Sequence, residues 1–287
     1  MNAPPVRNVP ALLQALREEE FTGTVRVSGS PGGTIHLRGG LVGAIETPGA
    51  PTAASALLTT GRVDDEAWLA ACATEPDADR VGAHLVAAGL VGAAELEIIC
   101  TAAVFDGAFA MALGPAGGWE TGDREPALVA APGAEPRALT EEVTRRTGLL
   151  ARTGVTPGEL ARLRPEAAGD PGSGAMGFGD GSPGAWLSRR HRELLDGVNG
   201  RRTPRDLAFA LGRGLFAVML DLHRLEALEL IRWEARAAPG NRPSTAPRVA
   251  PEGLTGPVPG GGPLPRRRPG GTSPARNHGE RGEKGGE

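Results

Sequence analysis

Residues 21–46 read FTGTVRVSGSPGGTIHLRGGLVGAIE, and this stretch decides how the first half of the chain folds. Two short runs in it alternate polar and apolar residues, which is the pattern of half-buried strands, and a third apolar run follows a glycine pair. Glycine fills the gaps between the runs and tolerates the positive φ that tight hairpins require. The stretch predicts a small antiparallel meander, with strands at 24–27, 34–37 and 41–46 and turns at 29–33 and 38–40.

Helical patterns surround this meander. An amphipathic run at 9–20 precedes it and places Leu12, Leu13 and Leu16 on one face. The segment after the meander predicts helices at 53–60, from 64 onward, at 79–88 and at 92–113, and a final strand at 117–122. We therefore expect residues 9–122 to form one α+β module.

Asp106 is the unusual residue of this module. It lies in the middle of the longest predicted helix, among apolar residues. A carboxylate is costly to bury unless it finds hydrogen-bond donors. Two roles are open for it: it faces a partner, or it caps a neighbouring helix.

Composition divides the remainder of the chain. Residues 123–167 carry helical patterns at 140–151 and 156–163 and are expected to form a helical connector. Residues 168–185 form a glycine-rich linker with almost no apolar residue. Residues 237–287 consist largely of proline, glycine, arginine and serine, which cannot bury enough apolar surface to offset chain entropy. We expect this last segment to be a disordered basic tail.

Residues 186–236 have the outline of a winged helix. Three helices are predicted at 186–198, 203–211 and 215–230, and a strand follows at 231–233. The second helix has a strong start signal, because Thr203 can cap it, Pro204 suits its first turn and Asp206 stands at its third position. The expected fold class is thus α+β, followed by an all-α winged-helix-like domain.

Charge is unevenly distributed along the chain. The formal net charge is −3, but residues 1–185 carry 13 arginines against 23 acidic residues, whereas residues 186–287 carry 18 basic against 11 acidic residues. A contact with duplex DNA is therefore expected at the C-terminal end, through 186–236 and the tail. The outward face predicted for the third helix, which includes Asp221 and Glu226, is too acidic to read bases. The candidate contacts with the DNA backbone are Arg201, Arg202, Arg205, Arg213 and Arg224.

No motif indicates catalysis, a cofactor or a metal site. Residues 172–177 match G-x-G-x-x-G but follow no strand and open no helix, so a dinucleotide site is rejected. A P-loop lysine is missing, the five histidines show no ligand spacing, and the two cysteines suit neither a zinc site nor a disulfide framework. No signal peptide or membrane span is recognised. We expect a non-enzymatic protein of the cytoplasm, without a membrane partner.

Residues 12–121 resemble the PATAN family, on the motifs FTGTV at 21–25, GTIHL at 33–37, GGLVGA at 39–44 and ALL at 56–58. That resemblance implies a bacterial signalling module that binds a protein partner and has no known activity. Residues 194–228 are similar to winged-helix segments of actinobacterial transcriptional regulators labelled as MarR type. Together they imply a bacterial transcriptional regulator that binds a protein through 9–122 and uses a winged helix to bind DNA or to dock. The alternative is a signalling adaptor that acts only through protein–protein contacts.

Overall fold

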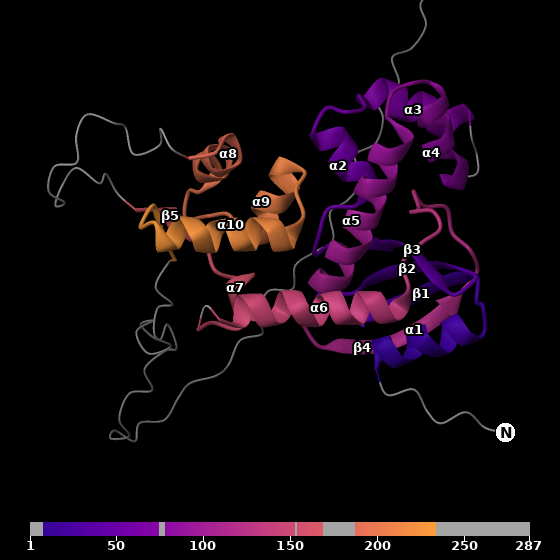
Figure 1. Ribbon diagram of the computed structural model, residues 1–287, viewed down its shortest axis with the longest axis horizontal. Helices are drawn as coiled ribbons and strands as arrows, with labels where there is room; N and C mark the ends of the chain where they lie inside the picture. The colour runs from indigo at the N-terminus through magenta and orange to yellow at the C-terminus, as the bar shows by residue number, and fades with distance from the viewer. Residues whose placement is uncertain (1–7, 75–77, 153, 169–186, 234–287) are drawn as a thin grey trace, which may run out of the picture. The chain divides into compact units, whose positions relative to one another are not determined.

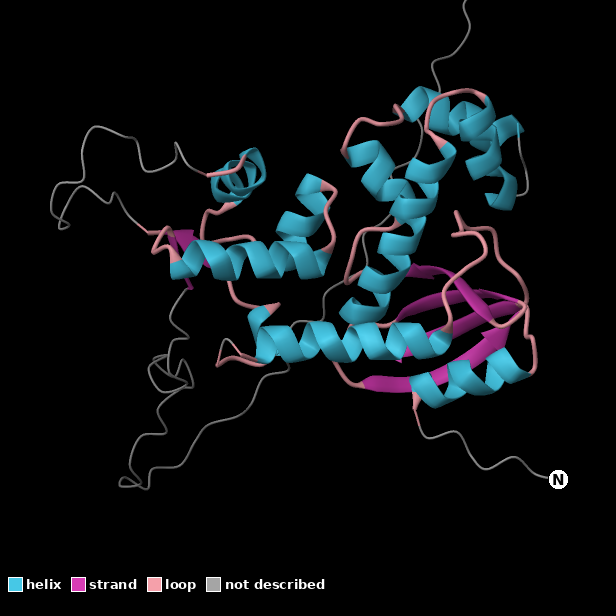
Figure 2. Ribbon diagram, in the orientation of Figure 1, coloured by secondary structure: helices cyan, strands magenta, loops and turns pink. Residues whose placement is uncertain are grey.

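A computed structural model describes residues 8–74, 78–152, 154–168 and 187–233. The expected tail at 237–287 and all but the first residue of the expected linker at 168–185 lie outside the described residues. The predicted α+β class is confirmed, because a four-stranded antiparallel sheet is combined with helices (Figure 2).

The meander forms at the expected place. Helix α1 (Val9–Glu18) leads into strands β1 (Gly23–Gly29), β2 (Gly33–Arg38) and β3 (Leu41–Glu46), which pair in antiparallel order. Gly39 and Gly40 make the β2–β3 hairpin with φ angles of 53° and 74°, values that residues with a side chain rarely adopt. Strand β4 (Ala116–Gly122) returns to pair with β1, so the strand order is β3-β2-β1-β4.

Four helices connect β3 to β4: α2 (Ala53–Thr59), α3 (Asp65–Thr74), α4 (Ala78–Ala87) and α5 (Ala93–Ala112). Helix α5 packs on β3 and shares one apolar core with the sheet and α1 (Figure 1). A smaller core joins α2, α3 and α4. Leu69 of α3 is 66% exposed, because the helix packs through Ala71 instead.

The first helix of the connector begins earlier than the sequence pattern at 140–151 indicated. Helix α6 spans Pro136–Ala151, because Pro136 takes the first helical position, where a missing N–H costs nothing. Helix α7 (Pro157–Leu160) follows, with Thr156 as its N-cap, and strand β5 (Pro165–Ala167) was not predicted. Helix α6 packs against both α5 and α1.

The C-terminal segment contains α8 (Arg189–Gly197), α9 (Pro204–Leu211), α10 (Leu215–Ala227) and strand β6 (Ile231–Trp233). The predicted strand pairs with β5 of the connector, antiparallel. The buried core of these helices also takes Phe109 and Ala110 from α5, Leu150 from α6 and Leu160 from α7. The C-terminal helices therefore share their core with the earlier part of the chain, and the described residues between 8 and 233 pack as one compact unit.

The exposure of two residues, one in α10 and one just after its end, follows from their surroundings. Leu228 is 44% exposed, since α10 ends at Ala227 and the chain turns away. Asp221 was predicted to face outward but is 2% exposed, since basic side chains of α8 and α10 enclose it. Among the described helices, none is both long enough and apolar enough to cross a membrane.

Candidate functional site

Asp106 connects α5 to the beginning of α10. The backbone N–H of Leu215 donates to Asp106 Oδ2 at 2.5 Å, and that of Phe216 donates to Oδ1 at 3.0 Å. Helix α10 has no capping side chain of its own, because its N-cap residue is Gly214. Asp106 therefore caps a helix that starts 109 residues later in the chain, the second of the two roles that the sequence left open.

An arginine and two aromatic rings complete this contact. Arg146 of α6 places Nη1 3.5 Å from Asp106 Oδ1, and its guanidinium carbon lies 4.9 Å from the centroid of the Phe216 ring. The ring of Phe216 meets that of Phe109 edge to face, with centroids 5.4 Å apart. We call Asp106, Phe109, Arg146, Leu215 and Phe216 the Asp106 junction. It ties α5, α6 and α10 together.

The junction changes the pKa of Asp106. Burial of the carboxyl raises its pKa, while the two backbone hydrogen bonds and the charge of Arg146 act in the opposite direction without cancelling the effect. A carboxyl with a raised pKa stabilises the folded protein most fully at pH values below the unfolded pKa. That contribution is lost as the pH rises through the folded pKa.

The arginines predicted to contact DNA fall into two groups. Arg201 and Arg202 are exposed in the turn before α9, where their backbone N–H groups donate to Asn199 Oδ1 at 3.0 and 3.2 Å. Arg205 is exposed on the first turn of α9, and its Nη2 lies 3.9 Å from Asp206 Oδ1. These three arginines are exposed and lie within five consecutive residues.

The other two candidates form ion pairs with carboxylates of this chain. Arg213 forms an ion pair with Glu193 of α8 and donates to the Arg190 carbonyl at 2.9 Å. Arg224 lies 3.3 Å from the buried carboxylate of Asp221, which also pairs with Arg190 at 2.8 Å. Both arginines therefore offset carboxylates of the C-terminal helices, whereas no such close pair is seen for Arg201 and Arg202 in the described residues. No sequence signal pairs Asp221 with Arg190, because the two residues lie on different helices.

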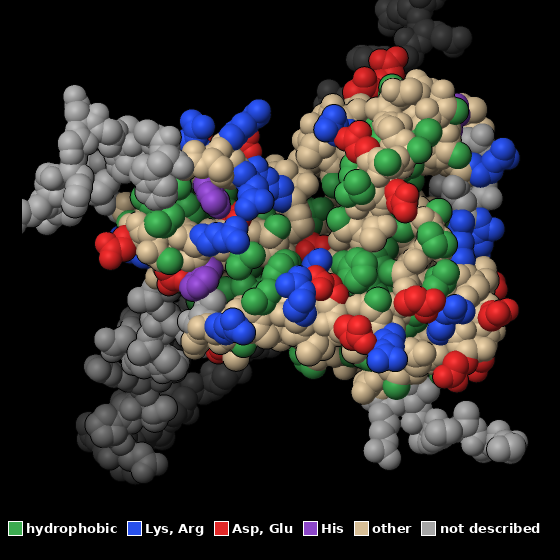
Figure 3. Space-filling view, in the orientation of Figure 1, with side chains coloured by type: hydrophobic (Ala, Val, Ile, Leu, Met, Phe, Trp, Pro, Cys, Tyr) green, Lys and Arg blue, Asp and Glu red, His purple; other side chains and the backbone are tan. Residues whose placement is uncertain are grey.

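Helix α5 carries an exposed apolar stripe on its outer side. Ile98 is 68% exposed, Ala102 is exposed and Phe105 is partly exposed. Their spacing of four and three residues places them on one face of the helix. Figure 3 shows hydrophobic side chains along α5 and beside α6 on this side of the molecule. Phe105 ends the stripe at a shallow groove that Glu142, Arg145 and Arg146 of α6 also line.

The described residues contain few side chains that are arranged for metal binding or thiol chemistry. Within residues 8–74, 78–152, 154–168 and 187–233, no group of three or more His, Cys, Asp or Glu side chains is arranged to hold a metal ion. Cys100 is buried, which raises the pKa of its thiol to about 11, and Cys72 is exposed on another helix. No protein-family model matches the sequence, and no curated protein or solved structure matches the chain either.

Proposed function

We propose that this chain is a non-enzymatic bacterial regulatory protein that acts in the cytoplasm as a signalling adaptor, through protein–protein contacts. In this proposal the PATAN-like segment at 9–122 binds a protein partner. The winged-helix-like segment at 186–236 is docked on that segment and does not read DNA. The observation that carries the proposal is the capping of α10 by Asp106.

The cap matters because α10 would be the recognition helix if the C-terminal helices act as a winged helix. The N-terminal residues of such a helix contact base edges in the major groove. In this chain Leu215 is 2% exposed and its N–H is bonded to Asp106, so the first residue of α10 is covered. Freeing it would break both hydrogen bonds from α10 and leave Asp106 with Arg146 as its described partner. Each lost hydrogen bond costs about 1–3 kcal/mol where the group stays buried.

The stripe on α5 supports the adaptor role. Ile98 and Ala102 are exposed on a helix whose other side is buried. Contiguous exposed apolar surface marks sites of protein interaction more often than the rest of a surface does. The charged side chains of Glu142 and Arg145 border the stripe at α6 and supply a polar rim.

DNA binding is the second candidate, favoured by the exposed Arg201, Arg202 and Arg205. Three arginines within five consecutive residues can position a duplex through its phosphates without reading its sequence. Three phosphate contacts correspond to a slope of about −3 for log K against log salt concentration. The measured salt slope therefore distinguishes DNA binding from the adaptor role.

The first test is a salt titration of a labelled duplex with the full chain, the chain ending at Arg236, and Arg201→Ala/Arg202→Ala/Arg205→Ala in that shorter chain. The adaptor proposal expects binding to disappear when residues 237–287 are removed. Retained binding with a slope near −3, abolished by the triple substitution, would replace the adaptor with a DNA-binding regulator.

The second test addresses the partner directly. A photoreactive residue at Ile98 or Ala102 is expected to crosslink to a discrete protein in the producing cells. The same residue at Arg189, whose side chain is 89% exposed on α8, serves as the control and should not yield that product. Identical products from α5 and α8, or none from α5, would contradict a partner on the stripe.

A further inference from the structure

A cavity of about 480 Å³ separates the sheet side of the molecule from α7 and α9. One wall comes from the turn between β1 and β2 and from Pro48, the residue second after β3. The opposite wall comes from the end of α7, the residues after it and the first turn of α9. Its volume lies within the range of about 300–1,000 Å³ typical of small-molecule sites.

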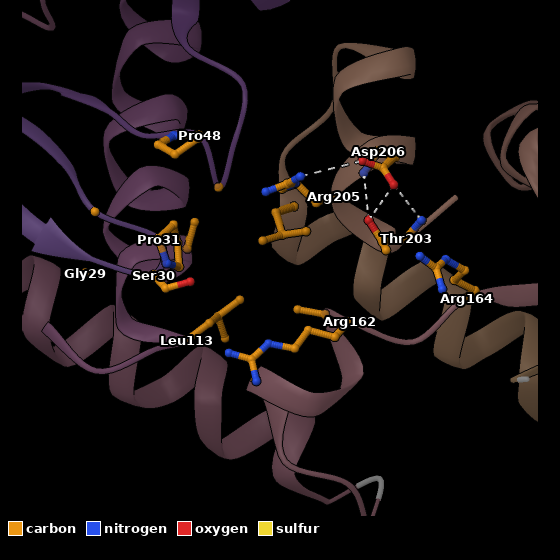
Figure 4. Close-up of a pocket in the computed structure, with 16 residues that line it drawn as sticks. Gly29, Ser30, Pro31, Pro48, Leu113, Arg162, Arg164, Thr203, Arg205 and Asp206 are labelled. Atoms are coloured by element: carbon orange, nitrogen blue, oxygen red, sulfur yellow. Dashed lines mark hydrogen bonds and ion pairs between the residues drawn. The ribbon is translucent and has the colours of Figure 1, made fainter. Parts of the chain in front are cut away.

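Three arginines line this cavity: Arg162, Arg164 and Arg205. Figure 4 shows Arg162 and Arg205 extending from the α7 and α9 side toward the turn that holds Ser30 and Pro31. Their guanidinium groups thus approach one space from two separate segments of the chain. Sequence analysis identified Arg205 alone, because the other two arginines follow a one-turn helix with no basic run around it.

These charges are not balanced by the carboxylate nearby. Asp206 is the one acidic residue lining the cavity, and its Oδ2 already accepts from the N–H of Thr203 at 2.9 Å. Its Oδ1 is 3.9 Å from Arg205 Nη2, too long for a hydrogen bond. In the described residues Arg162 forms no ion pair, and Arg164 donates from Nε to the carbonyl of Arg201 at 3.1 Å. The cavity therefore carries an excess of two positive charges.

The rest of the lining is largely apolar. Pro31, Pro48, Leu113 and Leu215 cover the side toward the sheet and α5, and Ser30 adds a hydroxyl. The carboxyl end of α5 at Leu113 contributes partial negative charge, which the arginines outweigh. A matching ligand has a strongly anionic end for the arginines and a less polar body for the proline and leucine wall.

We propose that this cavity binds a small organic phosphate of about nucleotide size, with Arg162 and Arg205 holding the phosphate. The planar guanidinium group forms paired hydrogen bonds with phosphate oxygens, which a less directional lysine does not. The ligand would contact the β1–β2 turn on one side and α9 on the other. It would therefore stabilise the docked arrangement of the C-terminal helices. This inference goes beyond the adaptor role and does not depend on it.

The test measures binding to the full chain by calorimetry, with a panel of nucleoside mono- and diphosphates and sugar phosphates. Inorganic phosphate and the nucleosides without phosphate are the chemical controls. At least one organic phosphate should bind, and removal of its phosphate should abolish binding. Arg162→Ala and Arg205→Ala should each weaken binding by about tenfold or more, the loss expected for a charge-assisted contact. Arg189→Ala removes the same charge on α8, outside the cavity, and should leave binding unchanged.

Several outcomes would overturn the proposal. One is that no member of the panel binds, and another is that the nucleosides bind as tightly as their phosphates. A third is that Arg162→Ala weakens binding no more than Arg189→Ala. If these arginines affect only the binding of duplex DNA, the cavity is part of a DNA-backbone contact and the small-molecule site is wrong. Arg162, Arg189 and Arg205 are all exposed, so their alanine variants should fold. The unfolding midpoint of each variant, measured without ligand, checks this.

Discussion

Helices α9 and α10 are neighbours, yet their N-termini are capped in different ways. At α9, Thr203 and Asp206 form a capping box, in which Asp206 Oδ2 accepts from the Thr203 N–H at 2.9 Å and the Asp206 N–H donates to Thr203 Oγ1 at 3.3 Å. At α10, the acceptor is Asp106, 109 residues earlier. Both helices need an oxygen for free N–H groups, but only one finds it nearby. The cap of α9 is therefore a local feature of the chain, whereas the cap of α10 is a feature of the whole fold.

The largest expected effect follows from removing the remote cap. Asp106→Ala should lower the free energy of unfolding by about 3 kcal/mol, because the buried N–H of Leu215 and the partly buried N–H of Phe216 lose their acceptors and Arg146 loses one of its two carboxylate partners. Denaturation in urea at neutral pH measures this change. Asp106→Asn keeps one acceptor oxygen and should cost clearly less. A loss below about 0.5 kcal/mol for the alanine variant, the range of an ordinary surface substitution, would show that the junction does not hold α10.

The aromatic part of the junction should have the next largest effect. Phe216→Ala removes the edge-to-face contact with Phe109 and the contact with Arg146, at an expected cost of about 2 kcal/mol. Phe209→Ala is the matched control, because this phenylalanine of α9 is 37% exposed and its loss should cost less. Thermal unfolding of the two variants gives the comparison, and equal destabilisation would count against a special role for Phe216.

Removal of the local cap should have a smaller effect. Thr203→Ala deletes the oxygen that accepts from the Asp206 N–H and should destabilise the protein by about 1 kcal/mol. Thr203→Ser retains that oxygen and should behave almost as the wild type does. If Thr203→Ala proves as damaging as Asp106→Ala in the same urea experiment, the distinction between local and remote caps fails.

The two aspartates should also respond oppositely to pH. Burial raises the pKa of Asp106. Burial has the same effect on Asp206, but its hydrogen bonds from Thr203 and the charges of Arg205 and Arg164 prevail and lower its pKa. The stabilisation from Asp206 is therefore present above about pH 4, the unfolded value, and is lost as the pH falls further. That from Asp106 is lost as the pH rises above the same value.

Urea unfolding between pH 3 and pH 7 checks this contrast. The cost of Asp206→Asn should shrink toward the acid end of the range, whereas the cost of Asp106→Asn should grow there. These are the smallest of the predicted changes, because Asp206 is partly exposed and solvent screens it. Parallel pH profiles for the two variants would contradict the assignment of opposite pKa shifts.

The distinction between local and remote contacts also explains how much of the structure the sequence predicts. The start of α9 was predicted correctly, because Thr203, Pro204 and Asp206 lie within four residues of one another. The meander at 21–46 was predicted for the same reason, since alternation and glycine turns are local signals. Strand β5 was missed, because it is three residues long and takes its pairing from β6, far along the chain.

The candidate site was predicted less well. Arg201, Arg202 and Arg205 are exposed as expected, since turns and first helical positions face solvent. The partners of Arg213 and Arg224 depend on how α8 and α10 pack, and helical periodicity within α10 gave the wrong orientation for Asp221. Arg162 and Arg164 acquire interest only because α7 lies opposite the β1–β2 turn, which no pattern in their own neighbourhood indicates.

The pairing of β5 with β6 has a consequence for how the chain tolerates cleavage. The N–H of Ala168 donates to the Leu230 carbonyl at 3.0 Å, and Leu187 is buried in the core that includes α10. Both ends of the segment at 169–186 are therefore anchored by contacts that do not pass through it. A protease that cuts this segment should yield two fragments that remain associated, and new termini placed there should leave the two-stranded sheet paired.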